Sequence, residues 1–149
     1  MKAYYLLIIW ALLAGAALPL QGSLNAKLGE AVKDPVYGAF ITFIIGGIGL
    51  LIYLLVTKVD FSTVGQVNNV HWSVWLGGLL GAFYVVAMII LVPKIGATLF
   101  FGLTIFGQMT LALLLDHYGF MGFPVQAINW QRIAGVVLIV GGVLLIRSF

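Results

Sequence analysis

The chain has 149 residues, of which 63% are hydrophobic and only 7% are charged, and its formal net charge is +3. A soluble domain has about 25% charged residues, so these few charges exclude a soluble globule, and we expect lipid to be the main solvent of the chain. The seven Lys and Arg are scattered singly, which excludes a nucleic-acid-binding face, and the absence of cysteine excludes disulfides and thiolate chemistry.

Five apolar runs approach the ~20 residues that a helix needs to cross the hydrocarbon core. Helices are expected because backbone groups in lipid must be satisfied within the protein, and the ~10-residue alternating segments of a β-barrel are missing. We therefore predict an all-α integral membrane bundle of five transmembrane helices, with residues 1–149 forming a single transmembrane domain. The predicted spans cover residues 4–28, 36–57, 74–92, 97–115 and 133–146.

The first span contains polar residues where hydrocarbon is expected. Pro19 removes one intrahelical hydrogen bond, so we predict a helix break there. Gln21 and Asn25 are four residues apart and share a helical face, on which Gly29 would let another backbone approach closely. The two amides are predicted to bind a ligand; the alternative is that they only bond a neighbouring helix.

The beginning of this span also resembles a signal peptide, because small residues follow an apolar run after Lys2. Apolar character resumes beyond Ala16, however, and the remainder would still cross a membrane several times. We therefore expect a transmembrane helix here.

The fourth span contains a second polar series, in which Thr104, Gln108 and Asp116 recur at multiples of four residues. Thr104 and Gln108 are predicted to line the substrate site opposite Gln21, with Tyr84 of the third span as an aromatic wall. Ionisable residues within spans are usually functional, so Asp116 is the candidate for proton coupling. The alternative is a solvated carboxylate at a helix end.

Catalytic patterns are missing from the sequence. It has no nucleophile elbow, no paired carboxylates and no phosphate-binding glycine loop. Neither histidine belongs to a cluster with metal-ligand spacing. We predict a protein that is not an enzyme and that needs no metal or cofactor.

The distribution of positive charge, which normally orients a membrane protein, is almost even. Lys2, Lys58 and Arg132 would lie on one side of the membrane, and four others on the opposite side: Lys27, Lys33, Lys94 and Arg147. One interpretation is a single orientation with the N-terminus outside. The other is insertion in both orientations and an antiparallel homodimer, which resembles the inverted repeats of many transporters.

Four segments resemble the YdcZ-like inner-membrane exporter family of the drug/metabolite transporter superfamily. The first is PLQGSLNAKLG in the first span, and the second is LVPKIGA after the third. The fourth span contributes GQ and LDHYG, and the fifth contains RIAG and VGGVL. These segments lie at residues 19–29, 91–97, 107–119 and 132–144.

The resemblance implies a five-helix half-transporter of the bacterial plasma membrane that pairs as a homodimer. The small multidrug resistance proteins, distant members of the superfamily, exchange protons for cationic drugs with a Glu in the first helix. Here the first span has no carboxylate before Glu30. The ligand is therefore expected to be neutral or zwitterionic, unless Asp116 supplies the charge.

Together these observations predict a small-solute transporter, an exporter, that works by alternating access around a midplane site. The alternative is a non-transporting accessory or assembly subunit, which would bind another membrane protein through its small-residue faces.

Overall fold

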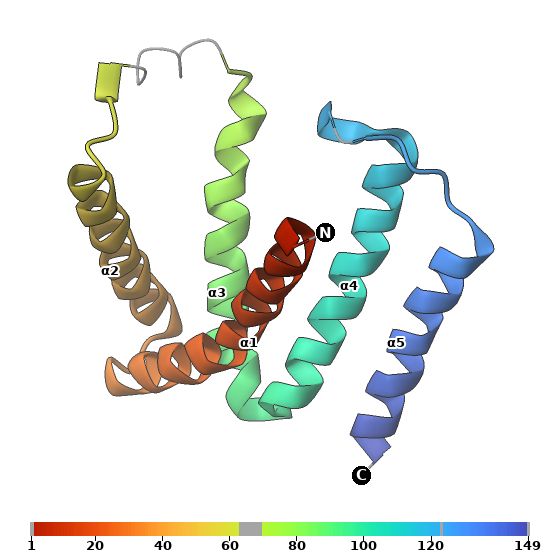
Figure 1. The fold of residues 1–149 in the computed structure, drawn as a ribbon. Coiled ribbons are helices and arrows are strands. Elements are labelled where there is room, and N and C mark those ends of the chain that lie inside the picture. Colours follow the sequence, from red (N-terminus) through yellow and green to blue (C-terminus); the bar gives the residue numbers. More distant parts are fainter. Residues whose placement is uncertain (1, 63–69, 123, 149) are drawn as a thin grey trace. The chain divides into compact units, whose positions relative to one another are not determined.

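The computed structural model describes residues 2–62, 70–122 and 124–148, and it confirms an all-α protein (Figure 1). Five helices are long and apolar enough to cross a membrane, and the described residues contain no strand. The long helices are α1 (Lys2–Ala31), α2 (Pro35–Val56), α3 (Leu76–Ile95), α4 (Ala97–Tyr118) and α5 (Trp130–Ser148). Two short 3₁₀ helices, η2 (Trp72–Trp75) and η3 (Phe120–Gly122), flank the loops.

The helix α1 runs without interruption from Lys2 to Ala31, so the helix break predicted at Pro19 is wrong. Proline removes its own amide donor, but lipid offers the neighbouring backbone groups no partner outside the helix, which favours continuing it. The hydroxyl of Ser23 donates a hydrogen bond to the Pro19 carbonyl oxygen at 3.0 Å. Lys27 also lies within this helix rather than in a loop.

The helix bounds differ from the predicted spans by a few residues, and for two of the ends the structure shows the local cause. The helix α3 continues past Pro93 to Ile95 and stops before Gly96, whose φ of 84° is accessible mainly to glycine. The helix α5 begins at Trp130 because Asn129 caps it. The side-chain oxygen of Asn129 accepts a hydrogen bond from the Arg132 amide at 2.9 Å.

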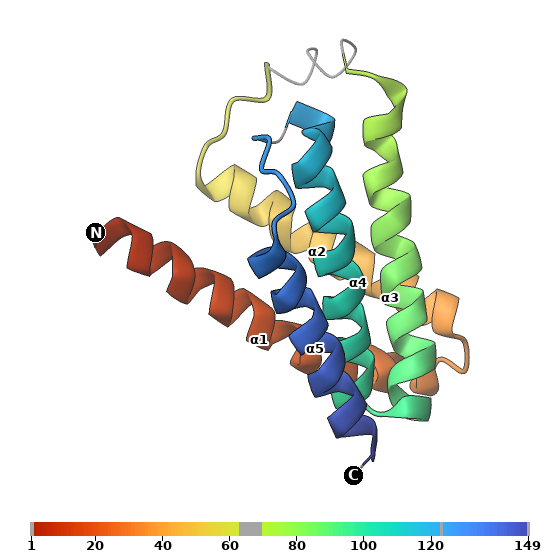
Figure 2. The same cartoon turned by 90° about the vertical axis from the view of Figure 1, so that its right-hand side faces the viewer.

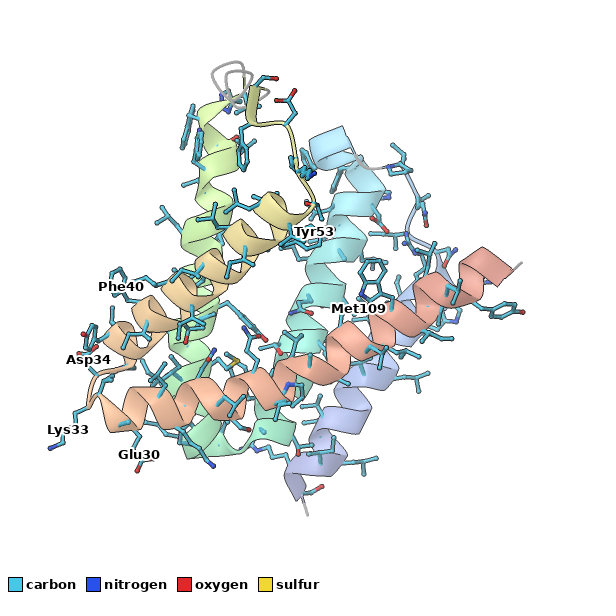
Figure 3. All side chains as sticks on the ribbon, turned by 60° about the vertical axis from the view of Figure 1, so that its left-hand side comes forward. Glu30, Lys33, Asp34, Phe40, Tyr53 and Met109 are labelled. Atoms are coloured by element: carbon cyan, nitrogen blue, oxygen red, sulfur yellow. The ribbon has the colours of Figure 1, made fainter. Side chains whose placement is uncertain are left out.

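The turn between α1 and α2 is closed by the backbone itself. Lys33 adopts a left-handed conformation with φ of 57°, and the amides of Lys33 and Asp34 donate to the carbonyls of Glu30 and Gly29 at 3.1 Å each. This is a Schellman motif. Asp34 then caps α2 by accepting a hydrogen bond from the Tyr37 amide at 2.7 Å, and Pro35 occupies the first helical position. Figure 3 shows Glu30, Lys33 and Asp34 around this turn.

The chain forms two compact units, Met1–Lys94 and Ile95–Phe149. In the first, α1 packs on α2, and α3 approaches α1 so closely that a Cβ on Gly29 would lie 2.5 Å from Cγ2 of Ile89. The confirmed role of Gly29 is thus close helix approach. Met88, which precedes Ile89 on α3, is fully buried.

The second unit consists mainly of α4 and α5, which lie side by side in Figures 1 and 2. They meet at Gly102, where an added Cβ would lie 2.8 Å from Cγ2 of Val143. Many large apolar side chains elsewhere on the five helices are exposed, for example Leu12, Phe83 and Leu138. Such exposure is expected of helices whose outer faces contact lipid.

Candidate functional site: an uncharged cavity in the first helical unit

Asn25 is the one polar residue that is buried among the described residues, with 6% of its surface exposed. Its Oδ1 accepts a hydrogen bond from the hydroxyl of Thr42 on α2 at 3.1 Å. Its Nδ2 has no hydrogen-bond partner in the described part of the chain. Buried donors are nearly always paired, so this half-satisfied amide requires an explanation.

Gln21 lies one turn before Asn25 and lines a cavity of about 470 Å³. This volume is within the range of small-molecule sites. The lining residues come from α1, α2 and α3: Gln21, Thr42, Phe43, Gly46, Gly47, Leu50 and Val85. The cavity therefore offers one amide and one hydroxyl on an otherwise apolar wall.

The cavity exists because α1 and α2 diverge from their turn, as Figure 3 shows. Next to the turn, a Cβ on Gly38 would lie 2.7 Å from Cα of Gly29, so the two backbones touch. One helical turn farther, Asn25 and Thr42 are joined by a hydrogen bond. Beyond them the helices are separated by the cavity, and a Cβ on Gly46 or Gly47 would meet no atom within 4 Å.

The other residues predicted for the substrate site lie on α3 and α4. Tyr84 is partly buried on α3 and precedes Val85, which lines the cavity, but Tyr84 does not line it. Thr104 donates its hydroxyl to the Phe101 carbonyl at 3.0 Å, and Gln108 is exposed. Both belong to the second unit, so their position opposite Gln21 stays a prediction.

Asp116, the predicted proton-coupling residue, forms an ion pair with Arg132. Nη2 of Arg132 lies 2.5 Å from Oδ2 of Asp116. The side chain of Arg132 is 28% exposed and that of Asp116 is 29% exposed. Nη1 of Arg132 donates to the Gln126 carbonyl at 2.9 Å. The pair joins the end of α4 to the start of α5 and borders a second cavity of about 320 Å³, between apolar residues of both helices. Asp116 is thus paired and not simply solvated.

The amino-acid sequence of this chain matches a protein family. The family model described as "Putative inner membrane exporter, YdcZ" matches residues 6–145. The chain belongs to this family. The inner membrane protein YdcZ of Escherichia coli (strain K12) is 29% identical over 139 residues, covering 91% of this chain and 92% of that protein. No solved structure matches. The resemblance in the sequence is thereby confirmed, and this YdcZ-family chain is a multi-pass protein of the bacterial inner membrane.

Two residues of these sites, Thr42 and Arg132, are missing from the sequence-based prediction as partners of Asn25 and Asp116. A signal for Thr42 exists in the sequence. Asn25 precedes Lys33 by eight residues, and Thr42 follows Asp34 by eight. In an antiparallel helical hairpin, residues at equal distances from the turn come together.

Proposed function

We propose that this YdcZ-family protein exports a small solute as a homodimer, by alternating access around a site that contains Gln21 and Asn25. The observation that carries the proposal is the cavity of about 470 Å³ beside Gln21, next to a buried amide that is only half paired. Polar groups in hydrocarbon are costly unless satisfied. A passing solute is a partner that could satisfy them.

The homodimer in this proposal follows from the size and the charge pattern of the chain. Transporters are commonly built from two related halves with the substrate site at their interface, and this chain supplies five spans. With an almost even distribution of Lys and Arg, two copies in opposite orientations would form such a pair. Thr104 and Gln108 would face the solute from α4, and Tyr84 would form an aromatic wall.

Proton coupling is assigned to Asp116 in this proposal. Protonation of Asp116 would remove the negative charge that holds Arg132 at the junction of α4 and α5, and would free that guanidinium to take another partner. Asp116→Asn should therefore abolish the dependence of export on a pH gradient across reconstituted vesicles. Unchanged dependence excludes Asp116 as the coupling group.

The site is tested by secretion from cells. The gene is overexpressed in a bacterium that lacks its own copy, and mass spectrometry compares the solutes in the medium with those of cells carrying the empty vector. Gln21→Leu and Asn25→Leu should reduce export of the enriched solute at least tenfold while the protein stays inserted. Ser23→Ala is the matched control, because Ser23 is an exposed polar residue of the same helix segment.

Three results would contradict the proposal. Equal secretion by all variants would exclude the site. No enriched solute, together with a stoichiometric unlike protein bound in mild detergent, would favour an accessory subunit. Reporters fused to the C-terminus test the antiparallel pair, since signal on one side of the membrane alone would exclude dual insertion.

A further inference from the structure

We propose that the cavity beside Gln21 takes an uncharged solute that combines an apolar body with a hydrogen-bond acceptor, such as a carbonyl oxygen. This inference rests on the proposed transport function and specifies the substrate class of the same site. Three properties of the cavity carry it: the charge of its wall, the unpaired donors next to it, and the room left by its glycines.

The wall of the cavity carries no charge among the described residues that line it. Five of its seven lining residues are apolar or glycine, and the other two are the amide of Gln21 and the hydroxyl of Thr42. An ion entering this space would lose its hydration without gaining a counter-charge, which is strongly unfavourable. The cavity therefore excludes cations and anions and accepts a mainly apolar, neutral molecule.

The acceptor requirement comes from Asn25. The Thr42 hydroxyl has one hydrogen and two acceptors nearby, Oδ1 of Asn25 and the Gly38 carbonyl, both at 3.1 Å. The geometry allows the hydroxyl to donate to either oxygen, and the bond to Oδ1 of Asn25 is the one that joins α1 to α2. That bond occupies Oδ1 and leaves both N–H donors of Nδ2 without a partner among the described residues. Asn25 is not itself among the residues that line the cavity, but it is bonded to Thr42, which is. Its unpaired donors are therefore one side chain away from the wall, and an acceptor that reaches past Thr42 would satisfy them.

The room in the cavity is set by Gly46 and Gly47 on α2. A Cβ built on either would meet no atom within 4 Å, so a side chain there would extend into space rather than into a helix. Gly49 on the same helix is equally open but does not line the cavity. Substitutions at Gly46 or Gly47 should therefore reduce the size of the solute accepted, and the same change at Gly49 should not.

Photolabelling of the purified full-length protein in lipid nanodiscs tests the inference. Benzophenone is the probe, because it is neutral, has two apolar rings and one ketone acceptor, and cross-links to neighbouring C–H bonds on illumination. Peptide mass spectrometry should find saturable labelling at residues such as Phe43 or Leu50. The cationic probe (4-benzoylbenzyl)trimethylammonium should label these residues at least tenfold less. Diphenylmethane, which lacks the oxygen, should compete at least tenfold more weakly than fluorenone, which retains a ketone.

Variants connect the labelling to the three properties. Gly46→Leu and Gly47→Leu should each abolish saturable labelling, whereas Gly49→Leu should retain it. Asn25→Leu has nearly the same size but has no hydrogen-bond donor, and it should weaken labelling by benzophenone at least tenfold.

Each contrary result removes a defined part of the inference. Equal labelling by the cationic probe overturns the uncharged class, and equal competition by diphenylmethane or full labelling of Asn25→Leu overturns the acceptor requirement. Saturable labelling that persists in both Gly46→Leu and Gly47→Leu places the probe elsewhere. If neither probe labels the cavity, the substrate class is wrong, while export itself is judged independently by the secretion assay.

Discussion

Replacing Gly38 by alanine should force the two helices of the α1–α2 hairpin apart. The new Cβ would lie 2.7 Å from Cα and 2.9 Å from N of Gly29. Because both are backbone atoms, no side-chain rotation relieves the overlap, and one helix has to move. Reaching ordinary van der Waals contact at 3.4 Å requires a separation of about 0.7 Å.

That separation extends to the next contact along the hairpin. The hydrogen bond from Thr42 to Asn25 is 3.1 Å long, and lengthening it by about 0.7 Å takes it beyond hydrogen-bonding distance. Overpacking costs about 1–3 kcal/mol, and an interhelical hydrogen bond in a membrane is worth about 0.6 kcal/mol. We expect Gly38→Ala to lower the free energy of unfolding by about 2 kcal/mol, a roughly 30-fold change in the folded-to-unfolded ratio.

The assay is reversible unfolding in mixed micelles of mild detergent and sodium dodecyl sulfate, followed by circular dichroism. Gly49→Ala is the control, since its Cβ meets no atom within 4 Å on the same helix. Alanine is a better helix former than glycine by about 1 kcal/mol, so the control should be unchanged or more stable. If Gly38→Ala is as stable as Gly49→Ala, the backbones of α1 and α2 do not approach each other as closely at Gly29 and Gly38 as the structure shows.

Three further predictions concern stability, and the same unfolding assay measures each. Gly102→Ala should destabilise the α4–α5 pair, because its Cβ would lie 2.8 Å from Val143 Cγ2. Adding Val143→Ala should restore part of the lost stability, and no restoration would contradict the contact between Gly102 and Val143. Arg132→Met should lower the free energy of unfolding by about 1–3 kcal/mol, because it leaves the Asp116 carboxylate half-buried and unpaired. Adding Asp116→Asn should make this loss smaller. An equal loss in the single and the double variant would show that the ion pair contributes nothing to stability. Lys33→Gly should stabilise the protein by about 1 kcal/mol, since a non-glycine residue at φ of 57° is strained, and a loss of stability would refute the strain.

The helix count and the approximate spans could be predicted from the sequence because lipid imposes a simple rule. Each crossing needs about 20 apolar residues with all backbone groups paired, and five runs satisfy it. The two errors at prolines share a cause. Prolines end helices in water, where water can bond the exposed carbonyls, whereas α1 and α3 continue past Pro19 and Pro93.

The geometry of the candidate site was only partly accessible to sequence reasoning. Gly29 and Gly38 each lie four residues from the Lys33–Asp34 turn, Asn25 and Thr42 eight, and Gln21 and Gly46 twelve. This series predicts which residues of α1 and α2 lie at the same level of the hairpin. It does not predict that Nδ2 of Asn25 is left unpaired, because that depends on the side-chain conformation that brings Oδ1 to Thr42.

The pairing of Asp116 with Arg132 was beyond such reasoning because the loop between them is irregular. The path of this loop is fixed by hydrogen bonds that the spacing of residues in the sequence does not predict. The Gln126 amide donates to the Asp116 carbonyl at 2.8 Å, and the Ile128 amide donates to Nδ1 of His117 at 3.2 Å. These bonds shorten the route from α4 to α5 and bring the guanidinium to the carboxylate.

The contacts that close the α1–α2 hairpin involve no residue later in the chain than Thr42. During synthesis, both helices are therefore complete before the ribosome has made α3. Local closure of a short turn takes far less than a second, much faster than elongation at 5–20 residues per second. We expect the two helices to leave the translocon as a pair, so that the nascent chain carries Asn25 into the bilayer with its carbonyl oxygen already bonded.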